Sequence, residues 1–124
     1  MQRGSTEIDN KSEEIRLDGI SFGKPFPVEE RNPPKKAALY LILRKDDGMI
    51  IYVGESGNLD DRDFWRGHHK YNCWLRVAGA EKNLAIAFHP MVDSTPVQRK
   101  EVESSLVRKL LPLCADPSRV LGPF

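Results

Sequence analysis

The sequence predicts an α/β (α+β) fold, in which a small antiparallel sheet of about three core strands is flanked by helices. Apolar runs at residues 37–44 and 49–53 surround a polar turn, which is the pattern of a β-hairpin. A further apolar run at residues 83–89 ends at Pro90 and predicts a third, buried strand. A strong helix start at Thr95 completes the evidence for a mixed fold.

Residues 1–36 are predicted to form an N-terminal arm, partly disordered, that lies on a domain formed by residues 37–124. The first 16 residues are polar and charged, which favours disorder. The apolar residues within 17–23 indicate one short strand. Four prolines between residues 25 and 34 then favour an extended connector.

The turn of the hairpin decides which face of the sheet its two tyrosines occupy. A two-residue turn would pair Tyr52 with Leu43 and place Tyr40 on the opposite face from Tyr52. A three-residue loop with Gly48 in the left-handed region would pair Tyr52 with Ile42 and bring both phenols to one face. Joint chemistry by the two tyrosines requires the second register, or another loop of odd length.

Two helices are predicted between the hairpin and the third strand. Asn58 is a candidate N-cap for a helix over residues 59–69. A shorter helix is predicted over residues 72–78, and Gly79 stops it because glycine adopts the left-handed conformation that ends helices.

The clearest helix start of the chain is at Thr95. Thr95 is the cap, Pro96 occupies the first helical position, and Gln98 three residues after the cap completes a capping box. We expect this helix to run to about Leu111, just before Pro112.

The composition is that of an ordinary single globular domain, with 40% hydrophobic and 30% charged residues. No apolar run approaches the ~20 residues of a membrane span, and the N-terminus lacks an apolar signal segment, so we expect a cytoplasmic protein without membrane contact. The net charge of +1, with the basic excess in residues 32–124, allows nucleic-acid binding without requiring it. Cys73 and Cys114 are too few for a disulfide framework, so we expect free thiols.

The most informative segment runs from Tyr52 to Arg62. A strand that contains a tyrosine ends at a glycine-rich corner, and the predicted helix that follows opens with a basic residue near its start. This order brings a phenol and a guanidinium near one corner, and such groups can bind and attack a phosphodiester. The upstream strand supplies a second phenol, Tyr40.

These residues resemble the signature of the GIY-YIG nuclease superfamily. Ala38–Tyr40 and Tyr52–Gly54 match its two tripeptide motifs, and Arg62 lies eight residues past the second glycine, where the family carries its arginine. Glu103 and Pro112 are similar to the family's glutamate helix and the Pro-x-x-Asn that ends it. The resemblance covers about two thirds of the chain and implies a GIY-YIG-like fold.

The resemblance also implies roles for the aromatic and basic residues. Tyr40 would be the general base that accepts a proton from the attacking water, while Tyr52 orients water or phosphate and Arg62 clamps the scissile phosphate. A phenol has a pKa near ~10, so it needs a nearby cation, such as Arg62 or a metal ion, to act as a base. Without the resemblance, the tyrosines would be core aromatics and Arg62 a solvated surface residue.

The helix after Thr95 separates two carboxylates. At ~100° per residue, Glu103 falls near the middle of the apolar arc and Glu101 points the opposite way. A carboxylate in an apolar stripe must be paired, protonated or bound to a cation. A buried Glu–Arg pair is one explanation. The resemblance implies instead that Glu103 binds Mg²⁺ (or Mn²⁺), for which one carboxylate with waters and phosphate oxygens suffices.

His68 and His69 are further candidates for the catalytic site, because the family often carries a histidine soon after its arginine. Their alternatives are a pair of cations at a helix C-terminus, or a zinc site together with Cys73 and Cys114. Substrate contacts are assigned to four residues on and after the glycine-rich corner: Gly54, Ser56, Arg66 and Lys70.

Two positions depart from the family pattern. Ala38 replaces a glycine, and Ala115 replaces the asparagine whose amide holds the family's active-site architecture. The predicted function is a metal-dependent endonuclease that hydrolyses nucleic-acid phosphodiester bonds, with DNA as the expected polymer. The alternative is a catalytically impaired nucleic-acid-binding or protein-interaction module on the same fold. No separate DNA-binding module is evident, so an accessory protein that supplies specificity is a further expected partner.

Overall fold

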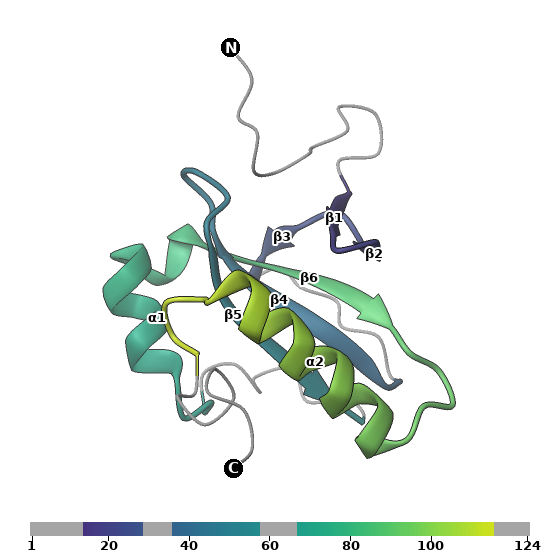
Figure 1. The fold of residues 1–124 in the computed structure, drawn as a ribbon. Helices are drawn as coiled ribbons and strands as arrows, with labels where there is room; N and C mark the ends of the chain where they lie inside the picture. Colours follow the sequence, from purple (N-terminus) through teal and green to yellow (C-terminus); the bar gives the residue numbers. More distant parts are fainter. Residues whose placement is uncertain (1–13, 29–35, 58–66, 116–124) are drawn as a thin grey trace.

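The computed structural model describes residues 14–28, 36–57 and 67–115 (Figure 1). Its main sheet has four antiparallel strands in the order β3-β6-β4-β5, and a separate pair of antiparallel strands, β1 and β2, lies beside it. The elements are β1 (Ile15–Leu17), β2 (Ile20–Phe22), β3 (Phe26–Pro27), β4 (Ala38–Arg44), β5 (Ile50–Ser56), α1 (Tyr71–Ala78), the 3₁₀ turn η2 (Glu81–Asn83), β6 (Leu84–Pro90) and α2 (Pro96–Leu110). The predicted α+β fold is confirmed, with the short strand β3 added to the three predicted core strands.

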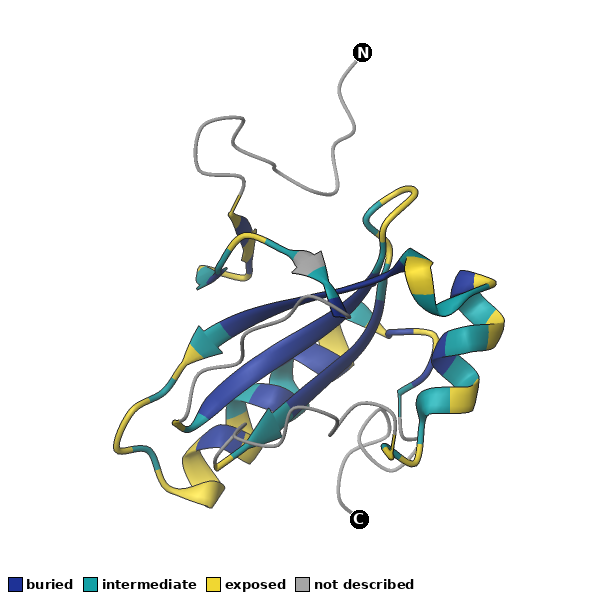
Figure 2. Ribbon diagram, turned by 180° about the vertical axis from the view of Figure 1, so that it is seen from behind, coloured by how far each residue is buried: buried dark blue, intermediate teal, exposed yellow. Residues whose placement is uncertain are grey.

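The main sheet buries both of its faces, and Figure 2 shows the middle of β4, β5 and β6 as buried. Side chains alternate between two core clusters because successive residues of a strand point to opposite sides. The α1 face comprises Val28, Ala38, Tyr40, Ile42, Ile51, Tyr52, Trp74, Ala78, Leu84, Ile86, Phe88 and Cys114. The α2 face comprises Ile15, Leu17, Phe22, Leu39, Leu41, Leu43, Val53, Ala87, Leu106 and Val107.

The register between β4 and β5 is the one that brings both tyrosines to one face. Tyr52 pairs with Ile42, as the second register predicted, whereas Leu43 pairs with Ile50. One residue of β5, Ile51, is therefore extra and forms a β-bulge. Ile51 and Tyr52 consequently lie in the same core cluster although they are consecutive. The register prediction is confirmed, but the bulge that produces it was not predicted.

The hairpin loop itself differs from the predicted three-residue loop. The Arg44 N–H donates to the Met49 carbonyl at 2.8 Å, so residues 45–48 form a loop of four. Gly48 has a φ of 73°, the left-handed conformation predicted for it, and its N–H donates to the Arg44 carbonyl at 2.8 Å. A four-residue loop alone would give the wrong parity, and the bulge in β5 restores the parity that the tyrosines need.

The N-terminal arm contributes more structure than the sequence indicated. The single short strand predicted within 17–23 is a hairpin instead, with Asp18 and Gly19 at φ angles of 52° and 80° in its turn. Asp-Gly with two positive φ angles is a favoured two-residue hairpin turn. Ile15 is 2% exposed, so the polar stretch ends before it. The proline-rich connector supplies β3, which pairs with β6 at the edge of the sheet.

The helices follow their sequence signals closely. Gly79 ends α1 with a φ of 91°, as predicted. Thr95 caps α2 through a complete capping box, in which the Gln98 N–H donates to the Thr95 hydroxyl at 3.1 Å. The predicted helix over 59–69 lies largely outside the described residues. Its predicted end is wrong, because residues 67–69 are not helical. Within the described ranges, no helix is both long and apolar enough to cross a membrane.

The two cysteines form a disulfide, so the expectation of free thiols is wrong. Cys73 lies on α1 and Cys114 follows α2, 41 residues later. The same bond excludes the alternative in which these sulfurs bind zinc with the histidines. The Cys114 N–H also donates to the carbonyl of the bulged Ile51 at 3.0 Å. Closing a loop of this length stabilises the folded chain by about 4 kcal/mol in the chain-entropy description.

Candidate active site

Tyr40 and Tyr52 lie next to each other on the α1 face. Their ring centroids are 6.2 Å apart, and the residues are 4% and 8% exposed. Tyr40 comes from the central strand β4 and Tyr52 from the edge strand β5, so the β-bulge at Ile51 determines that the rings meet. The structure thus brings two phenols together in a largely dehydrated place, where the field of a nearby charge acts on them more strongly than in water.

Gly54 provides the space that the Tyr40 phenol occupies. The two residues are direct partners in the β4–β5 ladder. A Cβ atom at Gly54 would lie 2.5 Å from the Tyr40 hydroxyl oxygen and nearer still to the ring carbon Cζ. From the sequence, Gly54 is predicted to contact the substrate. Its observed neighbour is instead the phenol predicted to be the base, so Gly54 positions that phenol.

Trp74 of α1 packs against both Tyr52 and a histidine. Trp74 is fully buried, and its ring lies 5.4 Å from the Tyr52 ring. His68, just before α1, lies 4.6 Å from Trp74 and 4.9 Å from Tyr52, edge-on to the tyrosine. Of the two candidate histidines, His68 is the one in contact with Tyr52, and the exposed His69 stacks on it at 4.5 Å.

The surroundings of His68 keep its imidazole neutral. Burial, followed by the charges of His69 and Lys70, lowers the pKa of His68 to about 4. The Lys70 N–H donates to His68 Nδ1 at 3.0 Å, so the ring proton is carried by Nε2. The interpretation as cations at the C-terminus of the helix over 59–69 concerns a segment that lies largely outside the described residues. A neutral His68 can donate one hydrogen bond from Nε2.

Glu103 is buried on α2, as its place in the apolar arc predicted. It is 2% exposed, whereas Glu101 on the same helix is exposed. Its neighbours along the helix, Leu106 and Val107, belong to the α2 face, so α2 packs on the other side of the sheet from the tyrosine rings. The helix packs mainly against β5, the edge strand that carries Tyr52. Glu103 and the tyrosines therefore meet the same strand from different sides.

A buried ion pair joins the end of β5 to the start of α2. Arg99, 6% exposed, donates from Nε to Glu55 Oε1 at 2.9 Å and from Nη1 to the Ser94 carbonyl at 2.9 Å. The burial of Arg99 shows that it does not lie on a solvated face of α2. Arg99 precedes Glu103 by four residues, so the helical spacing that found Glu103 also places Arg99 on the buried side. No sequence pattern indicated that Glu55 would form an ion pair.

The remaining predicted site residues follow Gly54 in the sequence. Ser56 ends β5 and Lys70 is the N-cap residue of α1, and both are partly buried. Arg62 and Arg66 lie outside the described residues. The structure therefore brings together Tyr40, Tyr52 and His68 and places Gly54 against the first of them.

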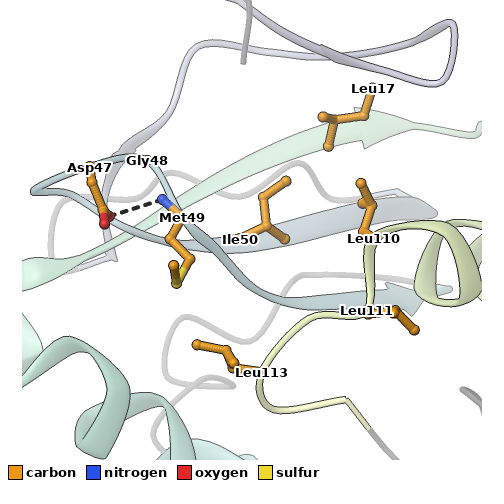
Figure 3. A pocket seen from close by; sticks show the side chains of 8 residues that line it. All are labelled: Leu17, Asp47, Gly48, Met49, Ile50, Leu110, Leu111 and Leu113. Atoms are coloured by element: carbon orange, nitrogen blue, oxygen red, sulfur yellow. Dashed lines mark hydrogen bonds between the residues drawn. The ribbon is translucent and has the colours of Figure 1, made fainter. Parts of the chain in front are cut away.

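A pocket of about 450 Å³ lies between the hairpin loop and the end of α2 (Figure 3). Its lining is mostly aliphatic, and the carboxylate of Asp47 in it accepts hydrogen bonds from Arg44 and the Met49 N–H. The lining residues are Leu17, Asp47, Gly48, Met49, Ile50, Leu110, Leu111 and Leu113. This chemistry suits apolar groups and offers little to a phosphate, so the pocket is not part of the candidate active site.

Comparison of the chain with protein-family models, with curated proteins and with solved structures finds no match. The candidate active site accordingly rests on the sequence motif and on the geometry of the aromatic cluster.

Proposed function

We propose that this chain is a metal-dependent endonuclease of the GIY-YIG type, which hydrolyses phosphodiester bonds of nucleic acid and takes DNA as its substrate. The observation that carries the proposal is the β4–β5 register, which puts Tyr40 and Tyr52 on one face with the Tyr40 phenol against Gly54. A bulge and a side-chain-free glycine are both needed for this arrangement. Sheet stability alone requires neither, which supports a role in chemistry.

The residues of the site have distinct tasks in this proposal. Tyr40 accepts the proton of the attacking water, and Tyr52 holds that water or a phosphate oxygen in line. His68 donates from Nε2 to a phosphate oxygen, a task that its neutral state permits. Arg62 supplies the positive charge that stabilises the developing phosphate charge and lowers the pKa of the phenol.

Glu103, on α2 and therefore on the other side of β5 from the tyrosine rings, is the proposed ligand of Mg²⁺ or Mn²⁺. Its carboxylate oxygens are the donors that these ions prefer, and a carboxylate at 2% exposure is stabilised by a cation. When bound, the ion would polarise a phosphate oxygen as a Lewis acid.

A binding module without catalysis is the second candidate, and Ala115 favours it. In the structure Ala115 packs partly buried against the α2 face, and its N–H donates to the Pro112 carbonyl at 3.2 Å. An alanine offers no side-chain amide at the position where the family has one. Such a module would bind nucleic acid or a protein partner without responding to magnesium.

The deciding experiment is a cleavage assay on plasmid DNA, branched DNA and RNA, with Mg²⁺, with Mn²⁺ and with EDTA. The variant Glu103→Ala is measured beside Glu101→Ala, which removes an exposed carboxylate from the same helix. The proposal expects metal-dependent cutting that Glu103→Ala abolishes and Glu101→Ala retains. Binding without cutting, including after Ala115→Asn, would instead select the binding module. Equal cutting by both variants would remove Glu103 from the metal site.

We also propose the cytoplasm as the compartment of this protein. Rapid acid quenching of cells followed by thiol alkylation would report whether Cys73 and Cys114 are bonded there. The result would show whether the disulfide exists in that compartment.

A further inference from the structure

The disulfide packs in the core cluster that contains the aromatic side chains of the candidate active site. Cys73 precedes Trp74 on α1, and Trp74 contacts both Tyr52 and His68. Cys114, at the other end, is 2% exposed in the same core cluster as Tyr40 and Tyr52. Both cysteines of the disulfide therefore belong to the residues that surround the two phenols and the imidazole.

A backbone hydrogen bond is a second link between Cys114 and the surroundings of the tyrosines. The Cys114 N–H donates to the carbonyl of Ile51, the bulged residue next to Tyr52. Through this bond and the disulfide, the segment after α2 connects the bulge of β5 to helix α1. Within the described residues α1 is a short helix of eight residues, of which Trp74 and Ala78 are buried. An isolated helix of this length has little stability, so the position of α1 depends on its packing against the sheet and on the disulfide.

We propose that the Cys73–Cys114 disulfide positions Trp74 and His68 against Tyr52, and that its reduction by a dithiol switches the site from ordered to disordered. The inference rests on the nuclease proposal for its functional consequence, although its structural part stands without it. Disulfides of cytosolic proteins are mostly transient and redox-sensing, so a cytoplasmic location would give this bond a regulatory use.

The redox step is a thiol–disulfide exchange. A thiolate of the dithiol attacks Sγ of Cys73, the partly exposed partner, and the thiolate of Cys114 leaves and takes up a proton. The second thiol of the reductant then attacks the mixed disulfide and releases Cys73 as a thiol. Two electrons and two protons pass to the protein, and the reductant becomes a cyclic disulfide.

The test compares the full chain oxidised and after reduction with dithiothreitol, with the thiol state verified by alkylation and mass spectrometry. NMR titration of the His68 ring is the first readout. In the oxidised protein His68 should titrate near pH 4, and reduction should move its pKa toward the ordinary value of 6.5 as the ring becomes solvated. Metal-dependent cleavage is the second readout and should fall by about tenfold to a hundredfold, as expected when a catalytic group is misplaced.

The matched control is the double variant Cys73→Ser/Cys114→Ser, which should behave as the reduced protein with and without dithiothreitol. If that variant does not fold, reoxidation of the reduced wild type must restore both readouts. A His68 pKa and a cleavage rate that are the same in both redox forms would overturn the inference and leave the nuclease proposal intact. A His68 pKa that moves in a protein that cuts in neither form would support the positioning role and reject the nuclease proposal.

Discussion

The two faces of the main sheet are covered by different kinds of side chain. The α2 face is filled mainly by aliphatic side chains, and α2 covers it with Leu106 and Val107. The α1 face carries aromatic rings with polar tips, and the helix that covers it has about half as many residues as α2. It is also the α1 face that carries the disulfide, the bulge and the glycine without which Tyr40 would not fit.

Under the proposed nuclease function, the contrast divides stability from chemistry between the two faces. Aliphatic side chains gain free energy from burial without directional demands, so the α2 face needs no special backbone features. Phenol and imidazole groups must be oriented and partly dehydrated, which takes backbone irregularities and a covalent link. Changes to the phenol and imidazole groups of the α1 face should therefore affect activity, and changes to the aliphatic side chains of the α2 face should affect stability.

The largest expected effect is that of Tyr40→Phe. The variant removes one hydroxyl from the α1 face and leaves the ring that fills the space over Gly54. If Tyr40 is the general base, the cleavage rate should fall by about 10²–10⁴-fold while the urea midpoint stays close to that of the wild type. Tyr71→Phe is the control, because Tyr71 lies on α1 and its hydroxyl donates to Glu81. Equal losses in both variants would contradict the role of Tyr40 as the general base.

Leu106→Ala should show the opposite pattern. Leu106 is fully buried on the α2 face, and its truncation leaves a cavity that should lower the free energy of unfolding by about 2–5 kcal/mol. Urea unfolding followed by circular dichroism measures the loss, and the folded fraction should cut at an unchanged rate. Val97→Ala, at an exposed site of the same helix, should leave the unfolding free energy nearly unchanged.

Gly54→Ala should affect both properties. The added Cβ overlaps the Tyr40 ring, and overpacking of this kind typically costs about 1–3 kcal/mol of folding free energy. Displacement of the phenol should also slow cleavage by more than the stability loss explains. Gly67→Ala provides the comparison, since a Cβ at Gly67 would meet nothing within 4 Å. Normal stability and a normal rate in the Gly54→Ala variant would show that Tyr40 has room elsewhere.

The smallest expected effect is the dependence of stability on His68 protonation. The folded pKa of about 4 lies below the ordinary value of 6.5, so the unfolded chain binds more protons between these pH values. Stability from this group should be complete above pH 6.5 and decline as the pH falls toward 4. Urea unfolding at several pH values should show a weaker decline for His68→Gln than for the wild type. His69→Gln, at the exposed neighbour, should keep the wild-type decline.

Signals that act over a few residues predicted the local structure well. The cap formed by Thr95 and Gln98 needs only residues within one helical turn, and Gly79 and Gly48 adopt the left-handed conformations expected of them. Asp18-Gly19 is likewise a local sequence pattern that is typical of a hairpin turn, although one strand was predicted there. In each case the physical cause lies within the segment itself.

Features that depend on distant contacts could not be predicted in the same way. The spacing between Cys73 and Cys114 carries no pattern, because their approach follows from how α1 and the end of α2 pack. The bulge at Ile51 has no glycine to mark it, and it appears only when β4 fixes the register. For the candidate site, the motif found the tyrosines and Glu103. The contact of Gly54 with Tyr40 and the Arg99–Glu55 pair required the structure.

The disulfide also makes the chain a closed ring between residues 73 and 114, and an exposed link of that ring is the segment between β6 and α2, where Val92 is 57% exposed. A single proteolytic cut there would give two polypeptides that remain one molecule until the bond is reduced. One would carry Tyr40, Tyr52 and His68, and the other would carry Glu103. The cut would thus place the proposed proton acceptor in one polypeptide and the proposed metal ligand in the other, with the disulfide as the covalent link between them.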